Sequence, residues 1–177
     1  MFIDLFEEED STIATERLTL RLLKDEDAED LFEIRGDGDT AGDAGVPVME
    51  SIEEVREYIA QWKENSVAVV LGDEVIGLIE SYSDKESMYN SVFLGYYMKR
   101  AHRNKGYMTE ALETLKEEMF ENGEPQLMLW IFPGNIASER VAEKCGWSLF
   151  SCRLVRIGGN IRFVDFYIQR NGDQEID

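Results

Sequence analysis

The chain has 177 residues, 44% of them hydrophobic, which is enough for one globular domain with its own core. Its 37 acidic residues against 18 Lys and Arg give a formal net charge of −19, and such a surface repels nucleic-acid backbones and anionic lipids. Neither nucleic acid nor a membrane is therefore expected as a partner.

The N-terminal part of the chain predicts one strand and two helices. Polar and apolar residues alternate over 17–23, which indicates a strand, and a helix is expected over about 26–35. The stretch 36–50 holds four glycines and a proline, and we expect it to be a long loop without regular structure. A capping-box sequence and apolar residues at helical spacing predict a second helix over 51–62.

The middle of the chain predicts three antiparallel strands and a helix. Two apolar runs, 67–71 and 74–82, are separated by Gly-Asp, a hairpin signal, and a third strand follows over 91–98. Residues 107–121 place their apolar side chains on one helical face. Because this helix connects two strands, the strand before it and the strand after it, at 127–132, are expected to be parallel.

The C-terminal part predicts a helix over 135–145, capped by Asn135, and two closing strands at about 147–156 and 161–169. The order of the elements predicts an α/β (α+β) fold. We expect a mixed, mostly antiparallel, twisted sheet of about seven strands with four helices on its faces.

The domain is expected to span residues 1–177, with a flexible acidic N-terminus at 1–13 and a flexible tail at 171–177. Two cysteines are interpreted as free thiols of a reducing compartment, so a cytoplasmic location is expected. With a single histidine in the chain, no metal site is expected.

A cluster of basic residues marks a candidate anion site. Lys99, Arg100, Arg103 and Lys105 lie within seven positions of an otherwise acidic chain. They follow a predicted strand and precede a predicted helix, where unpaired backbone N–H groups and the helix dipole favour an anion. Gly106 permits close approach of the backbone to a ligand. A solvated basic loop is the alternative, but the order of strand, loop and helix favours a phosphate site.

Two common phosphate motifs are excluded. A Walker A sequence does not occur in the chain. The Gly-x-Gly-x-x-Ala sequence at 36–41 follows a predicted helix rather than a strand, and it carries acidic side chains where a pyrophosphate would lie. The residues alone leave the identity of the phosphate ligand open.

Three segments of the chain carry a family resemblance. Residues 103–111, Arg-Asn-Lys-Gly-Tyr-Met-Thr-Glu-Ala, resemble the acetyl-CoA motif of the GNAT superfamily, although Met108 stands where a small residue is usual. Residues 135–147 resemble the Asn-x-x-Ser helix and the Lys-x-Gly-aromatic step of the RimJ/RimL-type branch of N-acetyltransferases. Residues 15–21 are similar to the first strand of that family.

The resemblance implies an acetyl-CoA-dependent N-acetyltransferase in which two central parallel strands are splayed apart to admit the pantetheine arm. It implies that the backbone of 103–108 binds the pyrophosphate and that a backbone N–H near Met98 polarises the thioester carbonyl. The residues implied in cofactor binding are Tyr97, Met98, Arg103, Asn104, Lys105, Gly106, Tyr107, Met108, Thr109, Asn135 and Ser138.

Direct acetyl transfer needs a base for the amine and a proton donor for the departing thiolate. Ser138 matches the serine of the family and is the expected donor, with a purely helix-capping role as the alternative. Glu80 is the first candidate for the base and Asp165 the second. A structural or solvated carboxylate is the alternative interpretation of each.

The sequence leaves the acceptor open among a protein N-terminus, a polyamine and another small molecule. The loop 36–50 and the hairpin 82–91 are expected to form its pocket. Their acidic residues, which favour a cationic amine, are Asp37, Asp39, Asp43, Asp84 and Glu86. A non-catalytic CoA-binding regulatory module is the alternative function, and both a monomer and a homodimer are compatible with the sequence.

Overall fold

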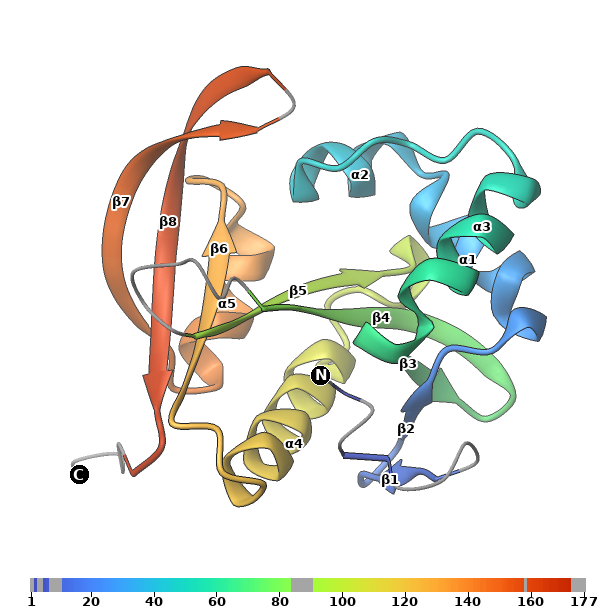
Figure 1. Cartoon of the computed structure of the whole chain (residues 1–177), viewed down its shortest axis with the longest axis horizontal. Coiled ribbons are helices and arrows are strands. Elements are labelled where there is room, and N and C mark those ends of the chain that lie inside the picture. The colour runs from blue at the N-terminus through green and yellow to red at the C-terminus, as the bar shows by residue number, and fades with distance from the viewer. Residues whose placement is uncertain (1, 3–4, 7–10, 84–90, 158, 173–177) are drawn as a thin grey trace.

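The computed structural model describes residues 2, 5–6, 11–83, 91–157 and 159–172 (Figure 1). Most of the predicted turn between the third and fourth long strands lies outside the described residues. This includes Asp84 and Glu86, two of the acidic residues expected near the acceptor.

An eight-stranded sheet forms the centre of the molecule, in the order β1-β2-β3-β4-β5-β6-β8-β7. Its strands are β1 (Ile13–Ala14), β2 (Thr19–Leu22), β3 (Ser66–Leu71), β4 (Glu74–Ser83), β5 (Val92–Met98), β6 (Gln126–Ile131), β7 (Ser148–Ile157) and β8 (Asn160–Arg170). Neighbouring strands are antiparallel except for β5 and β6, which are parallel. The predicted mixed α/β fold is confirmed, with the two-residue strand β1 as an addition.

Helices cover both faces of this sheet, and each face has its own apolar core (Figure 1). The α-helices are α1 (Ala28–Arg35), α2 (Gly38–Ala44), α3 (Ile52–Trp62), α4 (Tyr107–Glu121) and α5 (Ile136–Lys144). Helices α1 and α3 bury their apolar side chains on one face, and α4 and α5 cover the other. Within the described part of the chain, no helix combines the length and apolarity that crossing a bilayer requires.

Helix α2 corrects the prediction of an irregular loop over 36–50. Its sequence contains Gly38 and Gly42 and has low helix propensity, which is why the local pattern indicated a loop. Tertiary contacts override that preference, because Thr40 and Ala41 are buried against the body of the protein. Gly45 ends the helix in the left-handed conformation, with φ of 69°.

Described residues near both ends of the chain contact the body of the domain. Phe2 and Phe6 belong to the core that includes the apolar side chains of α4, and β1 pairs with β2. At the other end, the Asn171 side chain donates hydrogen bonds to the carbonyl oxygens of Phe120 and Glu124.

The parallel strands β5 and β6 are splayed. Their register runs from Val92–Leu127 to Leu94–Leu129 and ends there, although β5 continues to Met98. The two strands therefore separate toward their carboxyl ends, as the resemblance implied. This separation positions the candidate site.

Candidate active site

A cleft of about 630 Å³ opens between the splayed ends of β5 and β6, a size typical of small-molecule sites. Its walls come from β5, the loop before α4, the first turn of α4, the end of β6, the first turns of α5 and the second half of α2. Ten of the eleven residues predicted to bind the cofactor line this cleft, and only Lys105 does not. The structure thus brings together segments that are far apart in the sequence.

The end of β5 offers backbone N–H groups to the cleft. Just beyond the strand, the N–H of Lys99 donates to the carbonyl oxygen of Ile76 on β4, at 2.8 Å. Successive amides of a strand point to opposite sides, so the N–H of Met98 points away from β4 and toward β6. Pairing with β6 has already ended at Leu94. The Met98 N–H is therefore directed into the gap between the strands.

The loop before α4 has the geometry of an anion site. Asn104 and Gly106 both adopt left-handed conformations, with φ of 62° and 82°, and Gly106 is the N-cap of α4. The first amides of a helix have no intrahelical acceptor, and alternating right- and left-handed residues turn successive N–H groups toward one point. Residues 104–106 are exposed at the rim of the cleft. A phosphate group is the chemistry that this loop fits.

Arg17 braces the outer side of this loop, a role that the sequence did not reveal. Its guanidinium donates a hydrogen bond to the carbonyl oxygen of Lys105 at 3.1 Å and stacks 4.6 Å from the centre of the Tyr107 ring. It also pairs with Glu110 of α4 at 2.7 Å. Arg17 belongs to the segment that resembles the family's first strand, but its partners lie about ninety positions away.

Glu110 is the acidic residue that holds the Arg17 side chain in place. Partial burial opposes its ionisation, but hydrogen bonds from the Thr15 hydroxyl, the Arg17 backbone amide and the Arg17 guanidinium lower the pKa of the Glu110 carboxyl below its usual value. The carboxylate is thereby held in its charged form.

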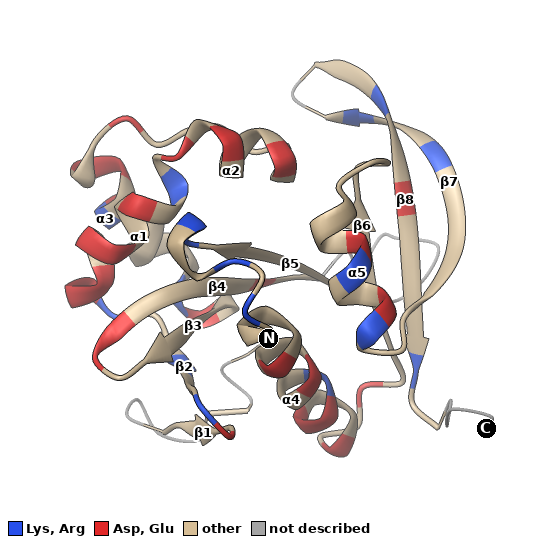
Figure 2. Cartoon of the chain, turned by 180° about the vertical axis from the view of Figure 1, so that it is seen from behind, with Lys and Arg blue, Asp and Glu red and all other residues tan. Residues whose placement is uncertain are grey.

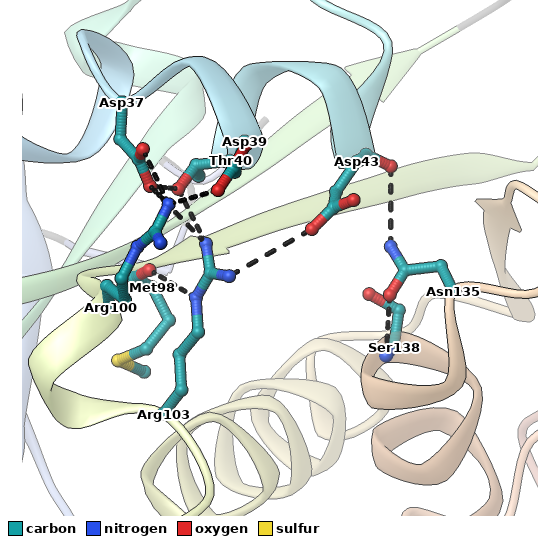
Figure 3. A network of polar contacts seen from close by, with 9 residues as sticks. All are labelled: Asp37, Asp39, Thr40, Asp43, Met98, Arg100, Arg103, Asn135 and Ser138. Atoms are coloured by element: carbon teal, nitrogen blue, oxygen red, sulfur yellow. Dashed lines mark hydrogen bonds and ion pairs between the residues drawn. The ribbon is translucent and has the colours of Figure 1, made fainter.

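The side chain of Arg103 crosses the mouth of the cleft toward α2 (Figure 3). Its Nε donates to the carbonyl oxygen of Met98 at 3.2 Å, and its guanidinium donates to the Thr40 hydroxyl at 2.5 Å. Asp43 lies 3.9 Å from the same guanidinium. Arg103 therefore connects the loop before α4 to both the end of β5 and α2.

Arg100 makes the second connection to α2. It pairs with Asp37 at 3.0 Å and also contacts the Asp39 carboxylate (Figure 3). A hydrogen bond from the Thr40 hydroxyl and the neighbouring Arg100 guanidinium lower the pKa of Asp37. The negative charges of the α2 carboxylates, which we expected near the acceptor, are thus compensated by two arginines of the segment before α4.

Helix α2 reaches the opposite wall of the cleft as well. The Asn135 side-chain amide donates to the carbonyl oxygen of Asp43 at 3.3 Å. Gly45, at the end of α2, lies against Phe132, because a Cβ at this position would be 2.5 Å from the ring. Helix α2 therefore spans the cleft from the loop before α4 to the start of α5.

Ser138 lies in the first turn of α5 and lines the cleft. Asn135 caps the helix, since its side-chain oxygen accepts a hydrogen bond from the backbone N–H of Ser138 at 3.2 Å. The Tyr96 hydroxyl donates to the carbonyl oxygen of Ser138 at 2.9 Å. The backbone of Ser138 thus carries the structural contacts, while its hydroxyl is not needed for the cap.

Glu80 is buried beneath the cleft and is 1% exposed. It forms an ion pair with Arg35 at 2.8 Å and accepts hydrogen bonds from the hydroxyls of Tyr58, Tyr82 and Tyr97. Burial raises the pKa of the Glu80 carboxyl, against the opposing effects of Arg35 and the hydroxyls. Glu80 does not line the cleft, but Tyr82 and Tyr97 do.

Asp165, the second candidate for the base, is not brought to the site. It lies on β8 in register with Cys152 of β7 and is not among the residues that line the cleft. Met108, the departure from the family motif, turns its side chain into the core, where it packs close to Gly77. Among the described residues, no group of three or more His, Cys, Asp or Glu side chains is placed to hold a metal ion.

The comparisons with known proteins agree with this geometry. Residues 17–148 match the family model described as acetyltransferase (GNAT) domain. A curated relative, the probable N-acetyltransferase YjcK of Bacillus subtilis (strain 168), is 30% identical over 76 residues. That match covers 42% of this chain and 42% of the relative, so the chain spans less than half the length of that protein.

Solved structures share the fold over nearly the whole chain. An acetyltransferase (GNAT family) from Bacillus anthracis has a TM-score of 0.82 at 22% identity, covering 92% of this chain and 100% of the other. RimJ of Mycobacterium smegmatis, solved in complex with CoA-disulfide, has a TM-score of 0.78 at 14% identity and covers 93% and 90%.

The residues matched by the family model include the splayed strands β5 and β6, the loop before α4, and α5, all of which line the cleft. The chain therefore belongs to the GNAT acetyltransferase family.

Proposed function

We propose that the chain transfers the acetyl group of acetyl-CoA directly to a primary amine of a protein N-terminus, a polyamine or another small molecule. One observation carries this proposal: a single cleft contains both the loop before α4 and the end of β5, which is no longer paired with β6 beyond Leu94. When bound, acetyl-CoA supplies the activated acetyl thioester. The N–H of Met98 is the group that we assign to polarising its carbonyl.

The cofactor would be held mainly by backbone. The amides of residues 103–108 are assigned to the pyrophosphate, because Asn104 and Gly106 turn the chain there and α4 begins at Tyr107. Arg17 is assigned a positioning role, since it holds the opposite side of the loop. Asn135 holds α5 at the cleft and fixes the place of Ser138.

Ser138 is proposed as the proton donor to the departing thiolate, and the proton that the attacking nitrogen loses as the amide forms restores the serine hydroxyl. It lines the cleft, and the capping interaction of α5 uses its backbone amide rather than its hydroxyl. The hydroxyl is therefore available for chemistry without loss of the cap. A positioned hydroxyl that protonates a leaving group is a common form of general acid catalysis.

Glu80 is proposed as the base, acting through a tyrosine. In this step, a cleft-lining hydroxyl of Tyr82 or Tyr97 accepts the proton of the amine and passes its own proton to the Glu80 carboxylate. The amine nitrogen is left neutral for attack, and Glu80 is left protonated. Burial raises the pKa of Glu80, which is the direction that a base for an amine requires.

The cationic character of the acceptor is also part of the proposal. Asp37, Asp39 and Asp43 are paired with Arg100 and Arg103 in this structure. An anionic cosubstrate on these arginines would compete for them and leave the carboxylates to attract a cationic amine. A cytoplasmic location is proposed as well, and both cysteines of the chain are free thiols.

The test is release of free CoA, followed with a thiol reagent, across a panel of N-terminal peptides, polyamines and small amines. We expect turnover with at least one class and faster turnover with cationic members of that class. Acetyl-CoA binding without turnover on any acceptor would indicate the CoA-binding module instead. Preference for anionic acceptors would contradict the role of the α2 carboxylates.

A further inference from the structure

An exposed apolar ridge lies on one face of the β7–β8 hairpin. Leu154 and Ile161 are each 62% exposed, and Phe163 is 58% exposed. Single exposed apolar side chains are common on protein surfaces, but a contiguous group on an otherwise charged protein marks an interaction site. The hairpin is also one end of the sheet, since β7 stands last in the order of the described strands, next to β8.

The register of the hairpin places these side chains in one block. Leu154 is paired with Phe163, Arg156 with Ile161, and Cys152 with Asp165. Paired residues share a face of an antiparallel sheet, and so do residues two positions apart. The three pairs therefore form three successive rows on the same face. We call these six residues the hairpin ridge.

The two charges of the hairpin ridge lie at its opposite ends. Arg156 is in the row toward the tip of the hairpin and Asp165 is in the row toward its base, with the Leu154–Phe163 row between them. Each charge is one row, or two residues, from the apolar centre. A surface with this arrangement is complementary to itself after a half turn.

The charge of the hairpin also differs from that of the remaining protein. Residues 148–170 carry four arginines and one aspartate, whereas the chain as a whole has a net charge of −19. Figure 2 shows basic residues on β7 and β8 and acidic residues gathered on the helices. Two copies that meet through the hairpin therefore avoid bringing their acidic helical surfaces together.

We propose that the hairpin ridge is the interface of a homodimer with a two-fold axis across the hairpin at the Leu154–Phe163 pair. In this arrangement the two hairpins run in opposite directions, and Leu154 lies over Leu154 of the partner subunit. Arg156 then lies beside Asp165 of the partner subunit, and the same ion pair forms twice. The other orientation, with both tips together, would bring the two Arg156 side chains near each other and is disfavoured.

The first test is the molar mass of the full chain by sedimentation or light scattering over a series of concentrations. We expect the mass to rise with concentration toward twice the monomer mass of 20.4 kDa. Leu154→Lys should abolish this rise, because two lysines would meet at the axis. The matched control is Val48→Lys, at an apolar residue that is 43% exposed and lies in the segment between α2 and α3. A monomer at every concentration, or a dimer that persists in Leu154→Lys, would overturn the proposal.

The second test reverses the charges. Arg156→Asp and Asp165→Arg should each weaken the dimer by tenfold or more, whereas the double variant should recover most of the wild-type affinity. Recovery is expected only if the two residues face each other across the interface. Additive loss in the double variant would contradict the arrangement.

The third test locates the axis. In a Cys152→Ser background, Leu154→Cys should form a disulfide-linked dimer under mild oxidation, since the two positions meet at the axis. Val48→Cys in the same background is the control and should remain monomeric on a non-reducing gel. Equal cross-linking of both variants would overturn the placement of the axis.

Discussion

The guanidinium of Arg17 donates a hydrogen bond to the carbonyl oxygen of Lys105 at 3.1 Å. The carbonyl of Lys105 and the N–H of Gly106 belong to one trans peptide group and point in opposite directions. By holding the carbonyl outward, Arg17 directs the N–H of Gly106 away from itself. A residue near the start of the chain thus sets the orientation of an amide in the cofactor loop.

Replacing Arg17 should weaken the binding of acetyl-CoA. We expect Arg17→Ala to raise the dissociation constant of acetyl-CoA roughly fivefold, because the lost contact is worth about 1 kcal/mol at a partly exposed site. Isothermal titration calorimetry measures this change. Arg56→Ala, at an exposed position of α3, is the control and should bind as the wild type does. Equal affinity of both variants would remove Arg17 from the site.

The Glu110 partner of this brace predicts a dependence of stability on pH. Because hydrogen bonds from Thr15 and Arg17 lower its pKa in the folded state, ionised Glu110 stabilises the fold above the ordinary pKa of a glutamate. This stabilisation is lost as the pH falls through the lowered pKa. The difference in melting temperature between the wild type and Glu110→Gln should therefore be large at neutral pH and shrink in acid. An equal difference at neutral and acidic pH would contradict this role of Glu110.

The tyrosines around Glu80 separate a catalytic role from a structural one. Tyr58, Tyr82 and Tyr97 all donate to this carboxylate, but Tyr58 does not line the cleft. Each change to Phe should cost about 1 kcal/mol of stability through the lost hydrogen bond. We expect Tyr82→Phe or Tyr97→Phe to lower kcat at least tenfold, with Tyr58→Phe close to wild type. A loss of kcat that follows stability in all three would show a structural role alone.

A variant of Ser138 likewise separates a catalytic role from a structural one. We expect Ser138→Ala to lower kcat about 100-fold, in the range of general acid catalysis, and to leave the dissociation constant of acetyl-CoA unchanged. The cap of α5 survives because Asn135 accepts from the backbone amide. The comparison of kcat with cofactor affinity and melting temperature decides the matter, and unchanged kcat would assign Ser138 to the helix alone.

Much of the fold was predictable because its elements have strong local signals. Helix α4 begins at Tyr107 and ends at Glu121, as the period of its apolar residues predicted, and the Gly72-Asp73 turn joins β3 to β4. Helix α2 was not predictable in the same way. Its glycines lower its helix propensity, and contacts with Arg100, Arg103 and Asn135 stabilise it in the folded protein.

The site was predictable only where its residues are consecutive. The loop 103–109 carries its own signal in charge, glycine and the start of a helix, and it lines the cleft as expected except at Lys105. Arg17 is 88 positions from Lys105, and three of the four partners of Glu80, namely Arg35, Tyr58 and Tyr97, are at least 17 positions from it, so no local pattern pairs them. Their roles depend on tertiary structure, which spacing along the chain does not encode.

We assign the pyrophosphate of acetyl-CoA to the loop around Gly106. Gly106 and Gly123 lie just outside the two ends of α4, and both have positive φ, of 82° and 95°. Replacing either by Val should cost a similar stability of roughly 1–2 kcal/mol, because a side chain disfavours this conformation. The decisive measurement is the dissociation constant of acetyl-CoA for the two variants. We predict at least a tenfold increase for Gly106→Val with wild-type affinity for Gly123→Val, and equal affinity in both would contradict the account.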